Sequence, residues 1–187
     1  MNPIIQNILT RRSVRKFKPD MIADNILDAI IEAGLYAPST KNKQARHFAI
    51  IKGQPNIDKV TDITREATAL CEPMRYPKVL NPAYTVNFGA PVFIIVTADP
   101  ESGNPEADGA VALENMFLAA HSLGVGSVWI NQLVPLANVP IFREFLTRCG
   151  VPEGYVVCGA AAFGYSAAEP VAAFPRREGQ VTVIEEL

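Results

Sequence analysis

The strongest constraint on the fold is the run Pro91-Val92-Phe93-Ile94-Ile95-Val96-Thr97, which is almost continuously apolar and rich in branched side chains. This composition is typical of a strand buried on both faces, because a strand with one face in water alternates apolar and polar residues. Shorter β-prone runs predict three further core strands, at 48–51, 127–130 and 155–164. The sequence therefore predicts a sheet that other elements must cover.

Segments of helical periodicity alternate with these strands. The predicted helices begin after Asn2, run from an N-cap at Asp20 to Ala37-Pro38, and cover 56–71, 107–123 and 140–148. The helix at 107–123 is apolar around much of its circumference, which predicts a central helix covered on most sides. Alternating strands and helices indicate a three-layer α/β or α+β domain. At 187 residues, the expected organisation is one domain spanning 1–187.

Charge and composition exclude several classes of function. A net charge of −2 argues against a nucleic-acid partner, because no basic field would attract a phosphate backbone. We expect no membrane association, since no apolar run approaches the length needed to span a membrane. We also expect no signal peptide in the first residues. Three widely spaced cysteines predict a reducing, cytoplasmic location, and the two histidines, His47 and His121, are too far apart to suggest a metal site.

A dense basic cluster at Arg11-Arg12-Ser13-Val14-Arg15-Lys16 places four cations and one hydroxyl directly behind the first helix. Arginine forks match phosphate oxygens two at a time, and each charge-assisted hydrogen bond contributes roughly 1.5–3 kcal/mol. The cluster is therefore a candidate phosphate site. It is equally consistent with cations that complement the C-terminal end of the helix dipole.

Two irregular segments carry further candidates. The polar loop Pro38-Ser39-Thr40-Lys41-Asn42-Lys43-Gln44 joins a helix to a strand, which is a common position for binding groups. Prolines forbid a continuous helix over 72–91. The aromatic residues of this segment, Tyr76, Tyr84 and Phe88, either stack on a ligand or anchor the loop, and packing is the favoured interpretation.

Common nucleotide fingerprints are missing, but the order of motifs resembles the nitroreductase family of FMN-dependent oxidoreductases. The glycine-rich segment 123–127 follows a helix and enters a strand, which is the wrong order for a dinucleotide fold, and there is no nucleophile elbow. The matching motifs are Arg11-Arg12-Ser13-Val14-Arg15-Lys16-Phe17, the loop 37–44, the segment 115–130, Gly164-Tyr165, and Pro175-Arg176-Arg177. Their order and spacing agree with the family pattern over nearly the whole chain.

The resemblance implies an α+β, three-layer α/β/α fold with a central, mainly antiparallel sheet around a long core helix. It also implies an interlocked homodimer with FMN at the subunit interface, NADH or NADPH as electron donor, and a small organic acceptor such as a nitroaromatic or a quinone. The C-terminal tail, about 170–187, would reach the partner subunit, where its β-prone segment 181–184 could pair with a strand.

The same resemblance assigns cofactor-binding residues. Arg11, Arg12, Ser13 and Arg15 would surround the phosphate, ribityl chain and pyrimidine edge, with Arg176 or Arg177 from the tail. Pro38, Ser39, Thr40, Asn42 and Gln44 would come from the other subunit. The backbone at Trp129, Ile130, Asn131 and Gln132 would meet the flavin N5 and O4 edge. Arg15 would stabilise negative charge at N1 and O2, and no catalytic acid or base is required because the flavin carries out the chemistry.

The chain departs from the family pattern in two places. Relatives usually follow the loop glutamine with proline and an aromatic residue, whereas Gln44-Ala45-Arg46-His47 stands here and adds charge near the expected mouth of the site. The segment 72–88 matches no motif. The alternatives are therefore a specialised reductive dehalogenase or dehydrogenase of the same fold, and a flavin-binding protein without turnover.

Overall fold

The computed structural model describes residues 1–71, 74, 77–169 and 171–186, and its described strands form one sheet. All neighbouring strands pair antiparallel, in the order β1-β2-β4-β3. The strands are β1 (Arg46–Lys52), β2 (Val92–Ala98), β3 (Gly126–Ile130) and β4 (Val156–Gly164). The predicted antiparallel sheet is confirmed.

Strand β2 occupies the middle of the molecule, between β1 and β4. Every residue of β2 is buried, as its continuous apolar sequence predicts. Alternate side chains enter different cores: Phe93 and Ile95 lie in one apolar cluster, whereas Ile94 and Val96 lie in the other. Burying each large apolar side chain contributes about 1.5–3 kcal/mol before conformational entropy is subtracted.

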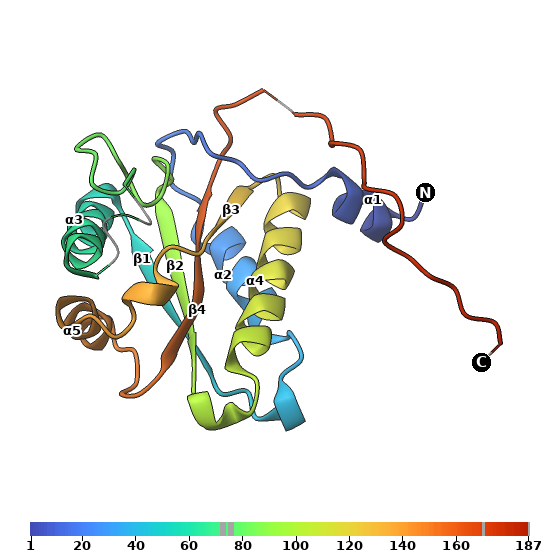
Figure 1. Ribbon diagram of the computed structural model, residues 1–187. Helices are drawn as coiled ribbons and strands as arrows, with labels where there is room; N and C mark the ends of the chain where they lie inside the picture. The colour runs from blue at the N-terminus through green and yellow to red at the C-terminus, as the bar shows by residue number, and fades with distance from the viewer. Residues whose placement is uncertain (72–73, 75–76, 170, 187) are drawn as a thin grey trace.

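Helices cover both faces of the sheet and make three layers (Figure 1). Helices α3 (Gln54–Cys71) and α5 (Pro140–Arg148) lie on one face. Helices α2 (Asp24–Leu35) and α4 (Pro105–Ser122) pack together on the other. The three-layer α/β/α arrangement predicted from the sequence is therefore confirmed.

Two details of the helices differ from the sequence prediction. Helix α2 begins at Asp24 after an N-cap at Ala23, not at Asp20, because Ile22 is buried in the core before the helix starts. Helix α4 buries only the side that faces the sheet and α2; its other side, including Val111, which is 38% exposed, faces outward. The helix that the sequence predicts to be covered on most sides is thus half covered in the single chain.

Helix α1 (Pro3–Thr10) and the C-terminal tail lie outside the three layers, beyond α4 (Figure 1). Helix α1 starts as predicted, with the Asn2 side chain accepting a hydrogen bond from the Ile4 amide at 2.8 Å. It has no buried residue, and one contact with α4 is the Asn7 side-chain amide donating to the Leu118 carbonyl at 2.9 Å.

The two outlying segments expose many large apolar side chains. The exposed residues are Ile4, Ile5, Ile8 and Leu9 in α1, and Val171, Phe174, Val181, Val183 and Ile184 in the tail. The β-prone segment 181–184 forms no strand within its own chain. Apolar surface of this extent is typical of a protein–protein contact. Among the described helices, none is long and apolar enough to cross a membrane.

Two helical glycines mark close contacts of different stiffness. A Cβ on Gly109 of α4 would lie 2.2 Å from the Cβ of Cys158, which is fixed to strand β4. A Cβ on Gly34 of α2 would lie 2.7 Å from the sulfur of Met116, the flexible part of a long side chain. The α4–β4 contact is therefore rigid, whereas the α2–α4 contact can adjust.

We expect Gly109→Ala to lower the free energy of unfolding by about 1–3 kcal/mol, because α4 must move away from β4. The matched control is Gly34→Ala, where the side chain of Met116 can move and alanine favours the helix by about 1 kcal/mol. Denaturant unfolding at one protein concentration measures both variants. Equal effects of the two substitutions would contradict the rigid α4–β4 contact.

Candidate functional site

The basic cluster follows the C-terminal end of α1 and lies against the first residues of strand β3. Ser13 forms an isolated parallel bridge with Ser127, and the Val14 amide donates to the Ser127 carbonyl at 2.9 Å. A Cβ on Gly126 would lie 2.8 Å from Cγ2 of Val14, so glycine allows this close approach. These contacts hold the segment against the sheet.

A cavity of about 560 Å³ opens where the cluster, the end of α4 and the start of β3 meet. Its size is typical of a small-molecule site. Its polar and charged lining comes from Thr10, Arg11, Arg12, Ser13, Arg15, Lys16, His121, Ser127, Ser166 and Glu169. Four cations oppose one carboxylate, so the cavity favours an anion. Among the described residues, no group of three or more His, Cys, Asp or Glu side chains could hold a metal ion.

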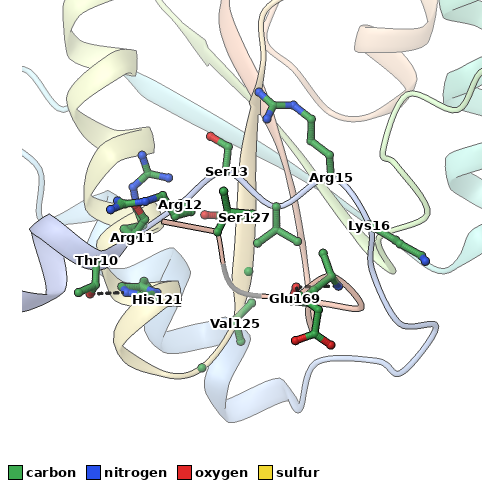
Figure 2. Close-up of a pocket in the computed structure, with 16 residues that line it drawn as sticks. Thr10, Arg11, Arg12, Ser13, Arg15, Lys16, His121, Val125, Ser127 and Glu169 are labelled. Carbon is green, nitrogen blue, oxygen red and sulfur yellow. Dashed lines mark hydrogen bonds between the residues drawn. The ribbon is translucent and has the colours of Figure 1, made fainter. Parts of the chain in front are cut away.

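Some side chains of the cluster already contact other parts of the protein, whereas others have no partner within the described chain. Arg11 lies 3.9 Å from the Glu114 carboxylate and 5.7 Å from the centre of the Phe117 ring. Arg12 donates to the Leu9 carbonyl at 2.9 Å, at the C-terminal end of α1. In contrast, no described residue pairs with the side chain of Ser13 or Arg15. Figure 2 shows both pointing to the same side of the segment, opposite Glu169.

Two buried polar atoms at this cavity have no protein partner among the described residues, namely Nε of Arg12 and Oγ of Ser127. Buried donors and hydroxyls are nearly always hydrogen-bonded in folded proteins. Arg12 therefore fits both interpretations of the cluster, since NH1 caps the helix end while Nε has no hydrogen-bond partner among the described residues.

His121, at the end of α4, lines the same cavity, although the sequence marks it only as a structural histidine. Its Nε2 lies 2.9 Å from the Thr10 hydroxyl (Figure 2). Burial lowers the pKa of His121, and the charges of Arg11 and Arg12 lower it further. The imidazole is therefore neutral at pH 7, and it contributes hydrogen bonding but no charge to the cavity.

The polar loop 38–44 lies at the opposite end of α4 from the cavity. Its Thr40 amide and hydroxyl donate to the carboxylate of Asp108, in the first turn of α4, at 2.9 and 3.0 Å. His121 is thirteen residues further along this helix, which corresponds to about 20 Å. One chain therefore does not bring the loop to its own basic cluster.

The backbone of the loop is strained. Lys41, Asn42 and Gln44 all have positive φ values, between 52° and 53°. Such conformations cost of order 1–3 kcal/mol each for residues other than glycine, and they persist where surrounding contacts enforce them. The side chains of Asn42 and Gln44 are exposed and contact each other at 3.3 Å.

The remaining predicted site residues also lie away from the cavity. Trp129, Ile130, Asn131 and Gln132 are at and beyond the far end of β3, about 13 Å from its first residue. Trp129 is 37% exposed and packs on Phe117. Arg176 and Arg177 are exposed in the tail, and Arg176 donates to the nearby Phe174 carbonyl.

The segment from 77 to 90 forms turns beside α3. Tyr84 packs against the core on that face, and burial raises the pKa of its hydroxyl. Arg65 of α3 donates to the Tyr84 carbonyl at 3.4 Å. Tyr84 thus anchors the segment, as the packing interpretation predicts, whereas Phe88 is 37% exposed. Tyr76 lies outside the described residues.

The fold and this anion-favouring cavity define an α+β protein with a small-molecule site at one end of its sheet, and comparison with known proteins gives the family. The model of the nitroreductase family matches residues 8–165, so the chain belongs to the nitroreductase family, as the motif order predicts.

Three relatives cover almost the whole chain. The crystal structure of a nitroreductase with bound FMN from Bacteroides fragilis is 34% identical, with a TM-score of 0.94 over 99% of this chain and all of that one. A nitroreductase with bound FMN from Desulfitobacterium hafniense is 28% identical, with a TM-score of 0.86 over the same shares. A protein of Archaeoglobus fulgidus, named for NADH dehydrogenase and NAD(P)H nitroreductase activities, is 31% identical over 88% of this chain and 86% of its own length.

Proposed function

We propose that the chain is an FMN-dependent oxidoreductase that takes hydride from NADH or NADPH and passes it to a small organic acceptor, such as a nitroaromatic or a quinone. Residues 1–187 would serve as one FMN-binding domain, located in the cytoplasm. The observation that supports this best is the cavity lined by Arg11, Arg12, Ser13 and Arg15, in a chain that is 34% identical to an FMN-bound nitroreductase over nearly its full length.

The residues present fit this cofactor. FMN carries a phosphate and a hydroxylated side chain, and the cavity offers cations together with the unpartnered Nε of Arg12 and Oγ of Ser127. Because the cluster follows the C-terminal end of α1, the helix dipole opposes a phosphate there. Side-chain cations must therefore provide the binding energy, and this chain supplies them.

The protein's contribution to the reaction is binding and orientation. FMN supplies the redox chemistry when bound, accepting hydride from the nicotinamide and releasing it to the acceptor. Arg11, Arg12 and Ser13 would hold the phosphate and ribityl chain. Arg15, whose side chain has no protein partner in the described chain, would hold negative charge at the pyrimidine edge of the ring.

A homodimer would complete the site. The loop with Pro38, Ser39, Thr40, Asn42 and Gln44 is about 20 Å from the basic cluster of its own chain, so a second copy is needed to bring the two together. The backbone at Ile130, Asn131 and Gln132 would border the ring, and Arg176 or Arg177 would reach the phosphate from the tail. Exposed apolar side chains on α1 and the tail support the same assembly.

The central test is the visible spectrum of the purified protein with FMN, before and after NADH or NADPH is added without oxygen. We expect tight uptake of flavin and rapid bleaching by the nicotinamide, because the site binds the cofactor and leaves it open to a hydride donor. Bound flavin that resists both nicotinamides would favour a binding protein without turnover. Bleaching that is slow, or that needs another donor, would favour a specialised dehalogenase or dehydrogenase, and no uptake would overturn the proposal.

We expect Arg12→Ala and Ser13→Ala each to weaken FMN binding by about 10-fold to 100-fold, since each removes one or two polar contacts with an anionic ligand. Flavin fluorescence during titration measures the Kd, and size-exclusion chromatography checks that the assembly persists. Arg148→Ala, at the end of α5, is the matched loss of a cation elsewhere and should leave the Kd unchanged. Unaltered binding in both cluster variants would contradict their assignment.

Ending the chain after Gly179 should weaken the dimer, because it removes the exposed apolar residues Val181, Val183 and Ile184. Sedimentation over a concentration series measures the dissociation constant, which we expect to rise by at least about 10-fold from the area lost. Replacing Glu185 and Glu186 by alanine keeps the apolar residues and serves as the control. A truncated chain that dimerises as tightly as the full one would contradict this role of the tail.

A further inference from the structure

Arg46 turns inward and ties together the backbone before the loop. Its NH1 donates to the carbonyls of Pro38 at 3.0 Å and Asp108 at 3.2 Å. Its NH2 donates to the carbonyls of Ala37 at 2.7 Å and Leu35 at 3.4 Å. Arg46 is half-buried, and burial lowers its pKa. The guanidinium of Arg46, which the sequence places near a ligand entrance, therefore donates its hydrogen bonds to four backbone carbonyls.

Asp108 holds the other side of the same loop. Asp108 is only 6% exposed, and both oxygens of its carboxylate accept a hydrogen bond from the Thr40 amide, at 2.9 and 3.1 Å. The Thr40 hydroxyl donates to it as well, at 3.0 Å. Since Arg46 also donates to the Asp108 backbone carbonyl, the two residues form one connected support for residues 37–40.

Both supports stand on rigid elements. Arg46 is the first residue of β1 and pairs with Ala98 of β2. Asp108 precedes Gly109, at which α4 lies against Cys158 of β4. The loop between them carries three residues at positive φ, and its Gln44 amide donates to the Ser39 hydroxyl at 2.9 Å. A strained loop whose first residues are held by Arg46 and Asp108, and whose Ser39 and Gln44 are hydrogen-bonded to each other, is preorganised.

We propose that Arg46 and Asp108 are positioning residues that hold the loop 38–44 in the conformation in which it meets FMN in the partner subunit. This inference rests on the proposed function. Neither side chain contacts the ligand in this role. Arginine is needed because its planar fork reaches carbonyls on two sides, whereas the single ammonium group of lysine cannot replace both sets of hydrogen bonds.

The variants that test this role are Arg46→Ala, Arg46→Lys and Asp108→Ala in the full-length protein. The matched control is Arg143→Ala, because Arg143 also uses its guanidinium to bind a backbone carbonyl, that of Tyr155 at 2.9 Å, but does so from α5, on the other face of the sheet from α4. Three measurements are needed on each protein: amide hydrogen exchange of residues 38–44 without flavin, the Kd for FMN, and the thermal midpoint.

We expect Arg46→Ala and Asp108→Ala to speed amide exchange in the loop and to weaken FMN binding by about 10-fold or more. Arg46→Lys should recover part of the affinity. Arg143→Ala should lower the thermal midpoint to a similar degree but leave both loop exchange and the Kd as in the wild type. This separation distinguishes positioning from a general loss of stability.

Wild-type FMN affinity in Arg46→Ala and Asp108→Ala, or unchanged exchange of the loop, would overturn this inference and leave the proposed function intact. Equal loss of affinity in Arg143→Ala would also overturn it, because the effect would then follow stability alone. A wild-type protein that takes up no FMN would overturn the proposed function and, with it, this role for the two residues.

Discussion

Burial of β2 on both faces is the constraint on which the rest of the structure depends. A strand of seven buried residues needs a helix layer above and below it, and it needs partner strands on both edges to satisfy its backbone. The layer made by α2 and α4 then lies against small residues of β4, where Gly109 admits the contact with Cys158. That contact fixes the position of α4, and α4 in turn determines where the parts of the site lie.

The length of α4 separates the two polar regions of the chain. Its first turn holds Asp108 and thereby the loop around Thr40, and its last turn holds His121 beside the basic cluster. Asp108 and His121 lie thirteen residues apart on this helix, about 20 Å, so no side-chain movement within one chain can join the two regions. A site that uses both regions would have to be assembled from two copies, and in the proposed dimer the exposed side of α4 together with α1 and the tail would provide the surface for that assembly.

Strands and helices could be predicted from the sequence because their signals are local. Apolar runs and 3.6-residue periodicity located every strand of the sheet and every helix of the layers, and the motif order identified the family. The predicted start of α2 was wrong. Asp20 is a favourable N-cap residue, but Ile22 is buried in the core ahead of the helix, which begins only at Asp24. Local propensity does not report such tertiary demands.

The cavity was predictable only in part, for the same reason. Four cations and a serine stand together in the sequence, so Arg11, Arg12, Ser13 and Arg15 could be singled out. His121 of α4 and Ser127 of β3 reach the cavity from two elements more than a hundred residues later. The partners of Arg46 illustrate the limit most clearly. Backbone carbonyls carry no sequence signature, and Asp108 lies sixty-eight residues from Thr40, so a charge expected near a ligand proved to be structural.

The proposed division of the site between two copies would also link cofactor binding to assembly. If each FMN contacts the basic cluster of one subunit and the loop of the other, it binds the dimer better than separate chains, and mass action then stabilises the dimer by RT ln(1 + [L]/Kd) for each site. The reverse also holds, since the dimer raises the affinity for FMN by the same coupling free energy. In this proposal, hydrogen bonds from Arg46 and Asp108 offset the free energy of the strained loop backbone when each chain folds. Association with the partner would then lose no further conformational entropy by ordering the loop.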